Sequence, residues 1–171
     1  MKFVLTVYIN MIIFLTIMMS IPLLVSEFTN KPIHMEEAFK QDFESFLKDA
    51  KKYKVSLNLR KHITTFSNTV QAGTAAYCVP STNTVVVSVK TWRTLNRRGK
   101  KALLYHEWAH CILRRDHADN MQYFPRFCPV SLMYPYIEPL ERCYTKESED
   151  EYNKELFTNP HNYKKFSRRK K

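Results

Sequence analysis

Residues 100–113 read Lys-Lys-Ala-Leu-Leu-Tyr-His-Glu-Trp-Ala-His-Cys-Ile-Leu. Apolar residues occur on nearly every side of a helix drawn through this run, a pattern typical of a helix buried in a protein core. His106 and His110 are four residues apart, so their side chains project about 40° apart on one face, and Glu107 lies at the edge of that face. The sequence therefore predicts a core helix that presents two imidazoles to a single metal ion.

This set of residues is the one that metal-assisted hydrolysis requires. Neutral imidazoles can hold zinc and leave a coordination position for water, while a neighbouring carboxylate takes the water's proton and passes it to the leaving amine. Without a metal, three polar side chains buried in an apolar helix would cost on the order of several kcal/mol unless they satisfied one another. We therefore predict zinc as the cofactor, His106 and His110 as ligands, and Glu107 as the catalytic base and then acid.

The residues that follow the helix extend this pattern. Asp116 and His117 are adjacent, and Ser-Leu-Met-Tyr occupies residues 131–134. This order resembles the metzincin metallopeptidases, whose signature is H-E-x-x-H-x-x-G-x-x-H, or the same pattern ending in Asp, followed by a Met-turn beneath the zinc. More narrowly, it is similar to small metzincin-like proteins of bacteria and phages. The resemblance covers residues 100–136 by motif, and the preceding helix and strands by their order alone.

The resemblance implies an α/β (α+β) zincin fold. A twisted, mixed, mostly parallel sheet and two helices would form its upper part, and an irregular, proline-rich C-terminal subdomain its lower part. It also implies a zinc metalloendopeptidase, with a peptide or protein as substrate. Metzincins bind peptides along a sheet edge, and residues 75–79 precede the strand that leads to the helix, so we expect an extended substrate to lie there.

The third ligand is where the sequence departs from the metzincin pattern. Leu113 stands at the position of the usual glycine, where a left-handed turn is unfavourable, so we expect the helix to run further before the chain reverses. Asp116 stands at the usual third-ligand position, and His117 follows it. Because imidazole is the commoner zinc ligand, we take His117 as the third ligand and Asp116 as the alternative.

Two other assignments remain open. In a gluzincin-like peptidase the third ligand would be a downstream glutamate such as Glu147 or Glu151. In a non-enzymatic, membrane-anchored protein, zinc would be a structural ion only. Some metzincins use a tyrosine two places after the Met-turn methionine as an extra ligand or oxyanion stabiliser, but that place is Pro135 here. Tyr134 and Tyr136 are weak candidates for this role, and we expect them to be packing residues instead.

The sequence pattern predicts one folded domain at residues 27–160. Residues 35–52 show the spacing of an amphipathic helix, and three β-prone runs at residues 55–60, 75–79 and 84–89 predict strands. Prolines after the core helix exclude long helices until about residue 147, where one late helix is expected.

The N-terminus and the cysteines indicate export. Residues 1–26 contain an almost wholly apolar stretch, which predicts either a cleaved signal peptide or an N-terminal membrane anchor. Four cysteines outside any Cys-x-x-Cys pair make two disulfides plausible, with three possible pairings. We therefore expect a membrane-anchored, secreted or periplasmic protein.

Composition narrows the function further. The chain has 171 residues and only two glycines, which excludes glycine-rich phosphate loops and nucleophile elbows. Much of the net charge of +11 comes from a basic tail at residues 161–171, which we interpret as a solvated terminus. We therefore expect no nucleic-acid partner.

Overall fold

The computed structural model describes residues 33–119, 121–122 and 127–158. The chain divides into two units, Met1–Lys31 and Pro32–Lys171, and all described residues belong to the second. The expected leader at residues 1–26 and the basic tail at residues 161–171 lie outside the described residues. Among the helices that are described, none is long and apolar enough to cross a membrane.

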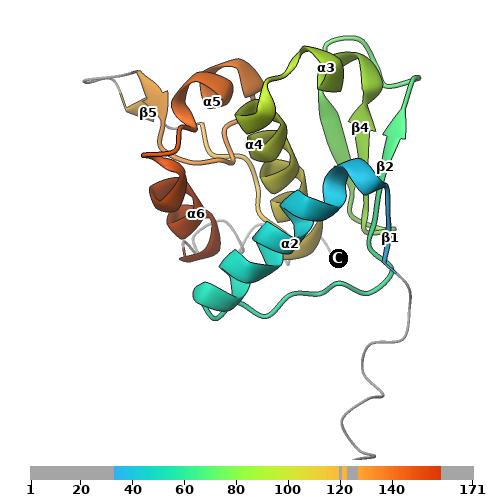
Figure 1. Cartoon of the computed structure of the whole chain (residues 1–171), viewed down its shortest axis with the longest axis horizontal. Helices are drawn as coiled ribbons and strands as arrows, with labels where there is room; N and C mark the ends of the chain where they lie inside the picture. The colour runs from blue at the N-terminus through green and yellow to red at the C-terminus, as the bar shows by residue number, and fades with distance from the viewer. Residues whose placement is uncertain (1–32, 120, 123–126, 159–171) are drawn as a thin grey trace, which may run out of the picture. The chain divides into compact units, whose positions relative to one another are not determined.

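A four-stranded sheet forms one side of the domain, in the order β1-β2-β4-β3 (Figure 1). The strands β1 (His34–Met35), β2 (Ile63–Ser67) and β4 (Thr84–Ser88) are parallel, whereas β3 (Ala76–Val79) pairs antiparallel with β4 and forms an edge. The expectation of a mixed, mostly parallel sheet in an α+β domain is confirmed.

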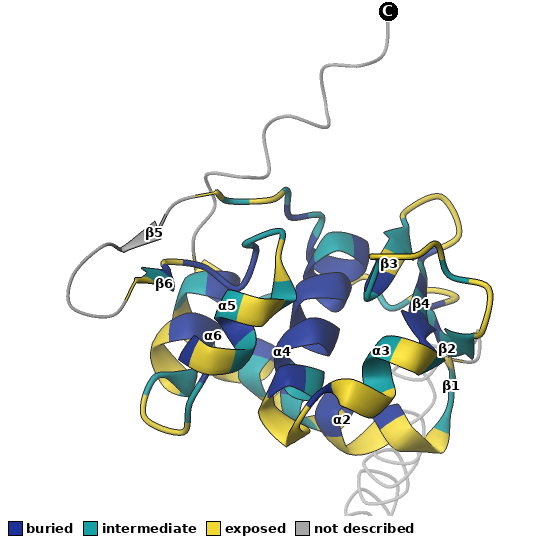
Figure 2. Cartoon of the chain, turned by 90° about the horizontal axis from the view of Figure 1, so that it is seen from above, coloured by how far each residue is buried: buried dark blue, intermediate teal, exposed yellow. Residues whose placement is uncertain are grey.

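The described residues form five α-helices beside this sheet, and α4 is the central one. Figure 2 shows α4 buried along most of its length, with α5 and α6 on one side and the sheet on the other. Two phenylalanines of α2 cover it: Phe43 and Phe46 meet the Trp108 ring edge-on, with ring centroids 5.0 and 5.4 Å apart. The helices are α2 (Glu37–Lys52), α3 (Val89–Thr94), α4 (Arg97–Trp108), α5 (Ile137–Cys143) and α6 (Glu149–Thr158).

The helix that carries the histidines begins earlier than the sequence indicates. The side chain of Asn96 caps it by accepting hydrogen bonds from the backbone N–H groups of Arg98 and Gly99, both at 2.9 Å. Glu141 of α5 accepts a hydrogen bond from the Asn96 backbone N–H at 2.9 Å. A Cβ at Gly99 would lie 3.0 Å from the Glu141 side chain, so a larger residue there would force that side chain to shift by a few tenths of an ångström.

The prediction of a strand at residues 55–60 is wrong. The strand β2, which the structure contains instead, was not predicted. Residues 55–60 form no ladder; Val55, Leu57 and Leu59 alternate because they are half-buried against the core. The true strand β2 turns the polar Thr64 inward, so it lacks the alternation of apolar residues that identifies a half-buried strand.

Thr64 is polar because it belongs to a buried hydrogen-bond network. Its hydroxyl accepts from Trp108 Nε1 at 3.0 Å and lies 2.9 Å from His62 Nε2. His62 Nδ1 lies 3.4 Å from the Asn83 side-chain oxygen, which can only accept, so the network assigns the proton to Nδ1. Burial lowers the pKa of His62 to about 4 and keeps the ring neutral at pH 7. The network ties α4 to β2.

The C-terminal part contains one more helix than predicted. The helix α5 forms despite Pro139, which lies in its first turn, where a backbone N–H would have no partner within the helix. A small antiparallel pair, β5 (Met121–Gln122) and β6 (Cys128–Pro129), precedes it.

Both expected disulfides are present. Cys78 pairs with Cys111, and Cys128 pairs with Cys143. The first bond joins the edge strand β3 to the end of the histidine helix, and the second joins β6 to α5. Two disulfides indicate an oxidising, extracellular environment.

Candidate metal centre

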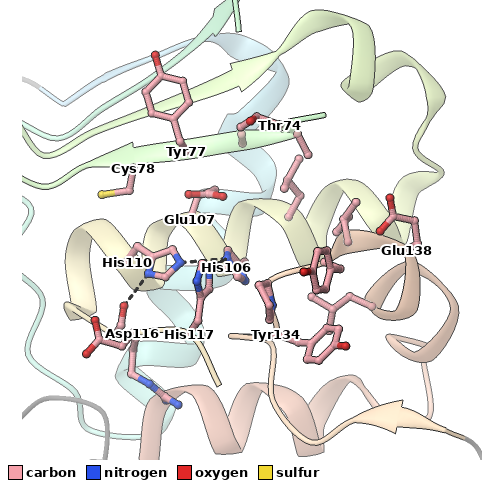
Figure 3. A pocket seen from close by; sticks show the side chains of 18 of the residues that line it. Thr74, Tyr77, Cys78, His106, Glu107, His110, Asp116, His117, Tyr134 and Glu138 are labelled. Atoms are coloured by element: carbon pink, nitrogen blue, oxygen red, sulfur yellow. Dashed lines mark hydrogen bonds between the residues drawn. The ribbon is translucent and has the colours of Figure 1, made fainter. Parts of the chain in front are cut away.

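Three histidines converge at the end of α4. One imidazole nitrogen from each of His106, His110 and His117 lies within 4.8 Å of the other two, and this group could hold a metal ion. His106 Nε2 lies 3.0 Å from His110 Nε2 and 3.2 Å from His117 Nε2. Figure 3 shows the three rings grouped beneath Glu107, on the side of α4 that faces the pocket.

A π-helical turn brings His117 into the group. The helix continues beyond α4 as η1 (Ala109–Leu113), in which each turn holds about one more residue than in an α-helix. Arg114 and Arg115 both donate their backbone N–H to Ala109, and Arg114 adopts the left-handed conformation with φ of 58°. The chain therefore runs through Leu113 and reverses one residue later, as expected from the absence of glycine there.

Backbone carbonyls orient two of the three rings. His106 Nδ1 donates to the Leu132 carbonyl, and His110 Nδ1 donates to the Arg115 carbonyl, both at 2.6 Å. Because a carbonyl can only accept, each Nδ1 carries the proton, and each Nε2 presents its lone pair to the centre of the group. This tautomer is the one a metal-ligating histidine adopts when its outer nitrogen is held by a carbonyl.

The backbone next to the third histidine is held by a turn. The backbone N–H of Ala118, which follows His117, donates to the Met133 carbonyl at 2.9 Å. Residues 131–134 form a tight turn, closed by a hydrogen bond from the Tyr134 backbone N–H to the Ser131 carbonyl, and Met133 within it is fully buried. This turn, which the sequence identified, thus binds the His106 ring through the Leu132 carbonyl and the backbone next to His117 through the Met133 carbonyl.

The electrostatics of the group favour a bound cation. Burial is the largest cause that lowers the pKa of His106, to about 3, and that of His110, to about 4, so both rings are neutral at pH 7. The Nε2 lone pairs of these two neutral rings face one another at 3.0 Å and repel unless a cation lies between them. Tetrahedral zinc would separate its nitrogen ligands by about 3.3 Å, and three imidazoles suit a transition metal better than Mg²⁺ or Ca²⁺.

Glu107 lies beside the histidines without belonging to their group. Its side chain is nearly buried, and burial raises its pKa to about 8, opposed by a hydrogen bond from the Cys78 backbone. A carboxyl group with such a pKa can accept and release a proton near neutral pH.

The centre opens into a cleft of about 530 Å³. The edge strand β3 forms one wall, and residues 134–138 with the start of α5 form the other. Apolar side chains dominate the second wall, among them Ile137 and Leu140. The histidine group therefore lies in a cleft between the sheet edge and the start of α5.

The other sequence candidates lie around this centre. Asp116 lines the cleft but is not part of the histidine group, and Glu147 and Glu151 are exposed and also outside it. Tyr134 packs partly on the core, but Tyr136 is 63% exposed, so its prediction as a packing residue is wrong. Both tyrosines line the cleft.

Sequence reasoning missed the backbone groups that hold the site. The carbonyls of Leu132 and Arg115 and the N–H of Cys78 carry no signal in the sequence, because every residue type offers the same backbone groups. They could have been found only from the tertiary contacts.

Comparison of the chain with protein-family models, with curated proteins and with solved structures found no match. The function is therefore argued from the geometry and chemistry of the site.

Proposed function

We propose that this protein is an exported, zinc-dependent endopeptidase with a metzincin-like active site. The observation that carries the proposal is the convergence of three imidazoles beside a buried carboxyl group at the wall of an open cleft. His106, His110 and His117 would hold the zinc. Zinc bound by three histidines lowers the pKa of a coordinated water and polarises a carbonyl group.

Glu107 is the group that moves the proton. Its raised pKa makes the carboxylate a stronger base than an exposed glutamate, so it can take a proton from the attacking water. The same carboxyl then gives the proton to the leaving amine. The hydrogen bond from the Cys78 backbone holds it in place between these steps.

The edge strand β3 is suited to hold the peptide. Ser88 donates its backbone N–H to the Ala75 carbonyl at 2.9 Å, which identifies residues 75 and 88 as a hydrogen-bonded pair. Such pairs alternate along an antiparallel ladder, so Tyr77 also bonds with β4, whereas the backbone groups of Ala76 and Cys78 point away from β4. An extended substrate can pair with this edge and pass the metal centre.

Proline at Ala76 tests this placement. Ala76→Pro removes an N–H that faces away from β4, so the strand should tolerate it, since proline is accepted at sheet edges. We expect cleavage to fall at least about tenfold while zinc content stays at one ion per chain. Ala76→Ser, which keeps the N–H, should retain activity. Unchanged cleavage by Ala76→Pro would show that the substrate does not pair with this edge.

Metal removal tests the activity itself. The purified chain should contain one zinc ion per molecule and should cleave an unfolded protein or a peptide library. Chelation should abolish cleavage, and added zinc should restore it, because the proposed chemistry requires the metal. Metal content by elemental analysis and cleavage by mass spectrometry are the measurements. A chain that binds zinc but cleaves neither substrate would instead have a structural metal.

A further inference from the structure

Arg115 is a fully buried arginine next to the metal centre. Its guanidinium donates to the Glu155 carboxylate at 2.7 Å and to the Leu156 carbonyl at 2.6 Å. A buried guanidinium is costly unless it is paired, and Glu155, forty residues further along the chain on α6, supplies the opposite charge. The pair therefore fixes the segment around Arg115 on α6.

The second carboxylate oxygen of Glu155 holds a different segment. Ser131 donates its hydroxyl to this oxygen at 2.6 Å, and the same hydroxyl accepts the backbone N–H of Met133 at 3.0 Å. Glu155 thus bridges the segment that follows the π-helical turn and the turn at residues 131–134.

Each of these two segments contains a backbone carbonyl that orients a histidine. The carbonyl of Arg115 holds His110, and the carbonyl of Leu132, directly after Ser131, holds His106. The Met133 carbonyl also accepts the backbone N–H that follows His117. The hydrogen bonds that orient two of the rings, and the one that holds the backbone next to His117, can therefore be traced to Glu155 through one or two intermediate contacts.

We propose that Glu155 is a positioning residue, which sets the metal affinity of the centre by holding the two segments that orient its histidines. The inference rests on the proposed function, because it requires that the three histidines bind a metal. It adds α6 to the site, although no residue of α6 belongs to the histidine group.

Glu155→Gln is the direct test. Glutamine keeps the shape of the side chain but loses the charge that pairs with Arg115. Its amide nitrogen replaces one carboxylate oxygen, so the side chain no longer accepts from Arg115 and Ser131 on two separate oxygens. We expect zinc affinity, measured by competition with a chelator, to fall about 10- to 100-fold. The absorption spectrum of the cobalt-loaded chain should also change, since the rings would take new orientations. Glu151→Gln, an exposed acid on the same helix, should alter neither measurement.

Metal readouts separate positioning from a general contribution to stability. If Glu155 only stabilised the fold, Glu155→Gln would lower the melting temperature and leave zinc affinity within about twofold of wild type, with the same cobalt spectrum. That result would overturn the inference and leave the peptidase proposal intact. A wild-type chain that binds no metal would overturn both.

Ser131→Ala provides a second test if Glu155→Gln does not fold. It removes one arm of the bridge and leaves the ion pair with Arg115 in place. We expect a smaller loss of zinc affinity, of a few-fold or more, because Glu155 then holds the segment of Arg115 but no longer the turn at residues 131–134. No loss of zinc affinity in Ser131→Ala would overturn the bridge.

Discussion

Glu107→Gln is expected to lower peptide cleavage by about 10²–10⁴-fold while the chain stays folded and keeps one zinc ion. The amide cannot take a proton from water, and Glu107 is not part of the histidine group, so catalysis and metal binding should separate. Glutamine can still accept the hydrogen bond from the Cys78 backbone and carries no charge that burial would penalise. Folding should therefore be retained. Cleavage rate, zinc content and melting temperature are the measurements.

Glu138→Gln is the matched control for Glu107→Gln. Glu138 is an exposed acid that lines the same cleft, so its replacement changes the charge of the cleft without touching the proposed base. We expect its activity to stay within a few-fold of wild type. Glu107→Gln and Glu107→Ala with wild-type activity would contradict the proposed mechanism, because the general base would then be another group.

His117→Ala is expected to weaken zinc binding by about 100-fold or more, since it removes one of three direct ligands. His117 Nε2 lies 3.2 Å from His106 Nε2, a separation close to that of two nitrogens on one zinc ion. Asp116→Asn should have a much smaller effect, because Asp116 lines the cleft but is outside the histidine group. Zinc affinity by chelator competition is the measurement.

The same measurement separates the alternative third ligands. A loss of zinc affinity in Asp116→Asn, with no loss in His117→Ala, would show that Asp116 is the third ligand and His117 is not. Glu147→Gln and Glu151→Gln should bind zinc as wild type does, because both side chains are exposed and outside the histidine group. Weakened zinc binding in either one would favour the gluzincin-like assignment.

Local periodicity explains which parts of the fold could be predicted. The helix α2 and the strands β3 and β4 show the apolar spacing that their burial requires, and the structure contains all three close to their predicted limits. The strand β2 was missed because its inward residue is Thr64, whose hydroxyl is satisfied by His62 and Trp108. No local sequence pattern could predict these hydrogen bonds, since Trp108 lies far from Thr64 in the chain.

The sequence by itself determined that His106 and His110 share a face, because residues four apart on a helix always do, and it identified the turn around Met133. Only the tertiary structure brought His117 to them. That placement depends on the π-helical turn and on hydrogen bonds to residues 131–134, which form when distant segments pack. The pairing of four cysteines and the bridge through Glu155 were decided in the same way. Helical spacing is a property of the local backbone, whereas a third ligand, a disulfide partner and an orienting carbonyl are chosen by contacts between segments far apart in the chain.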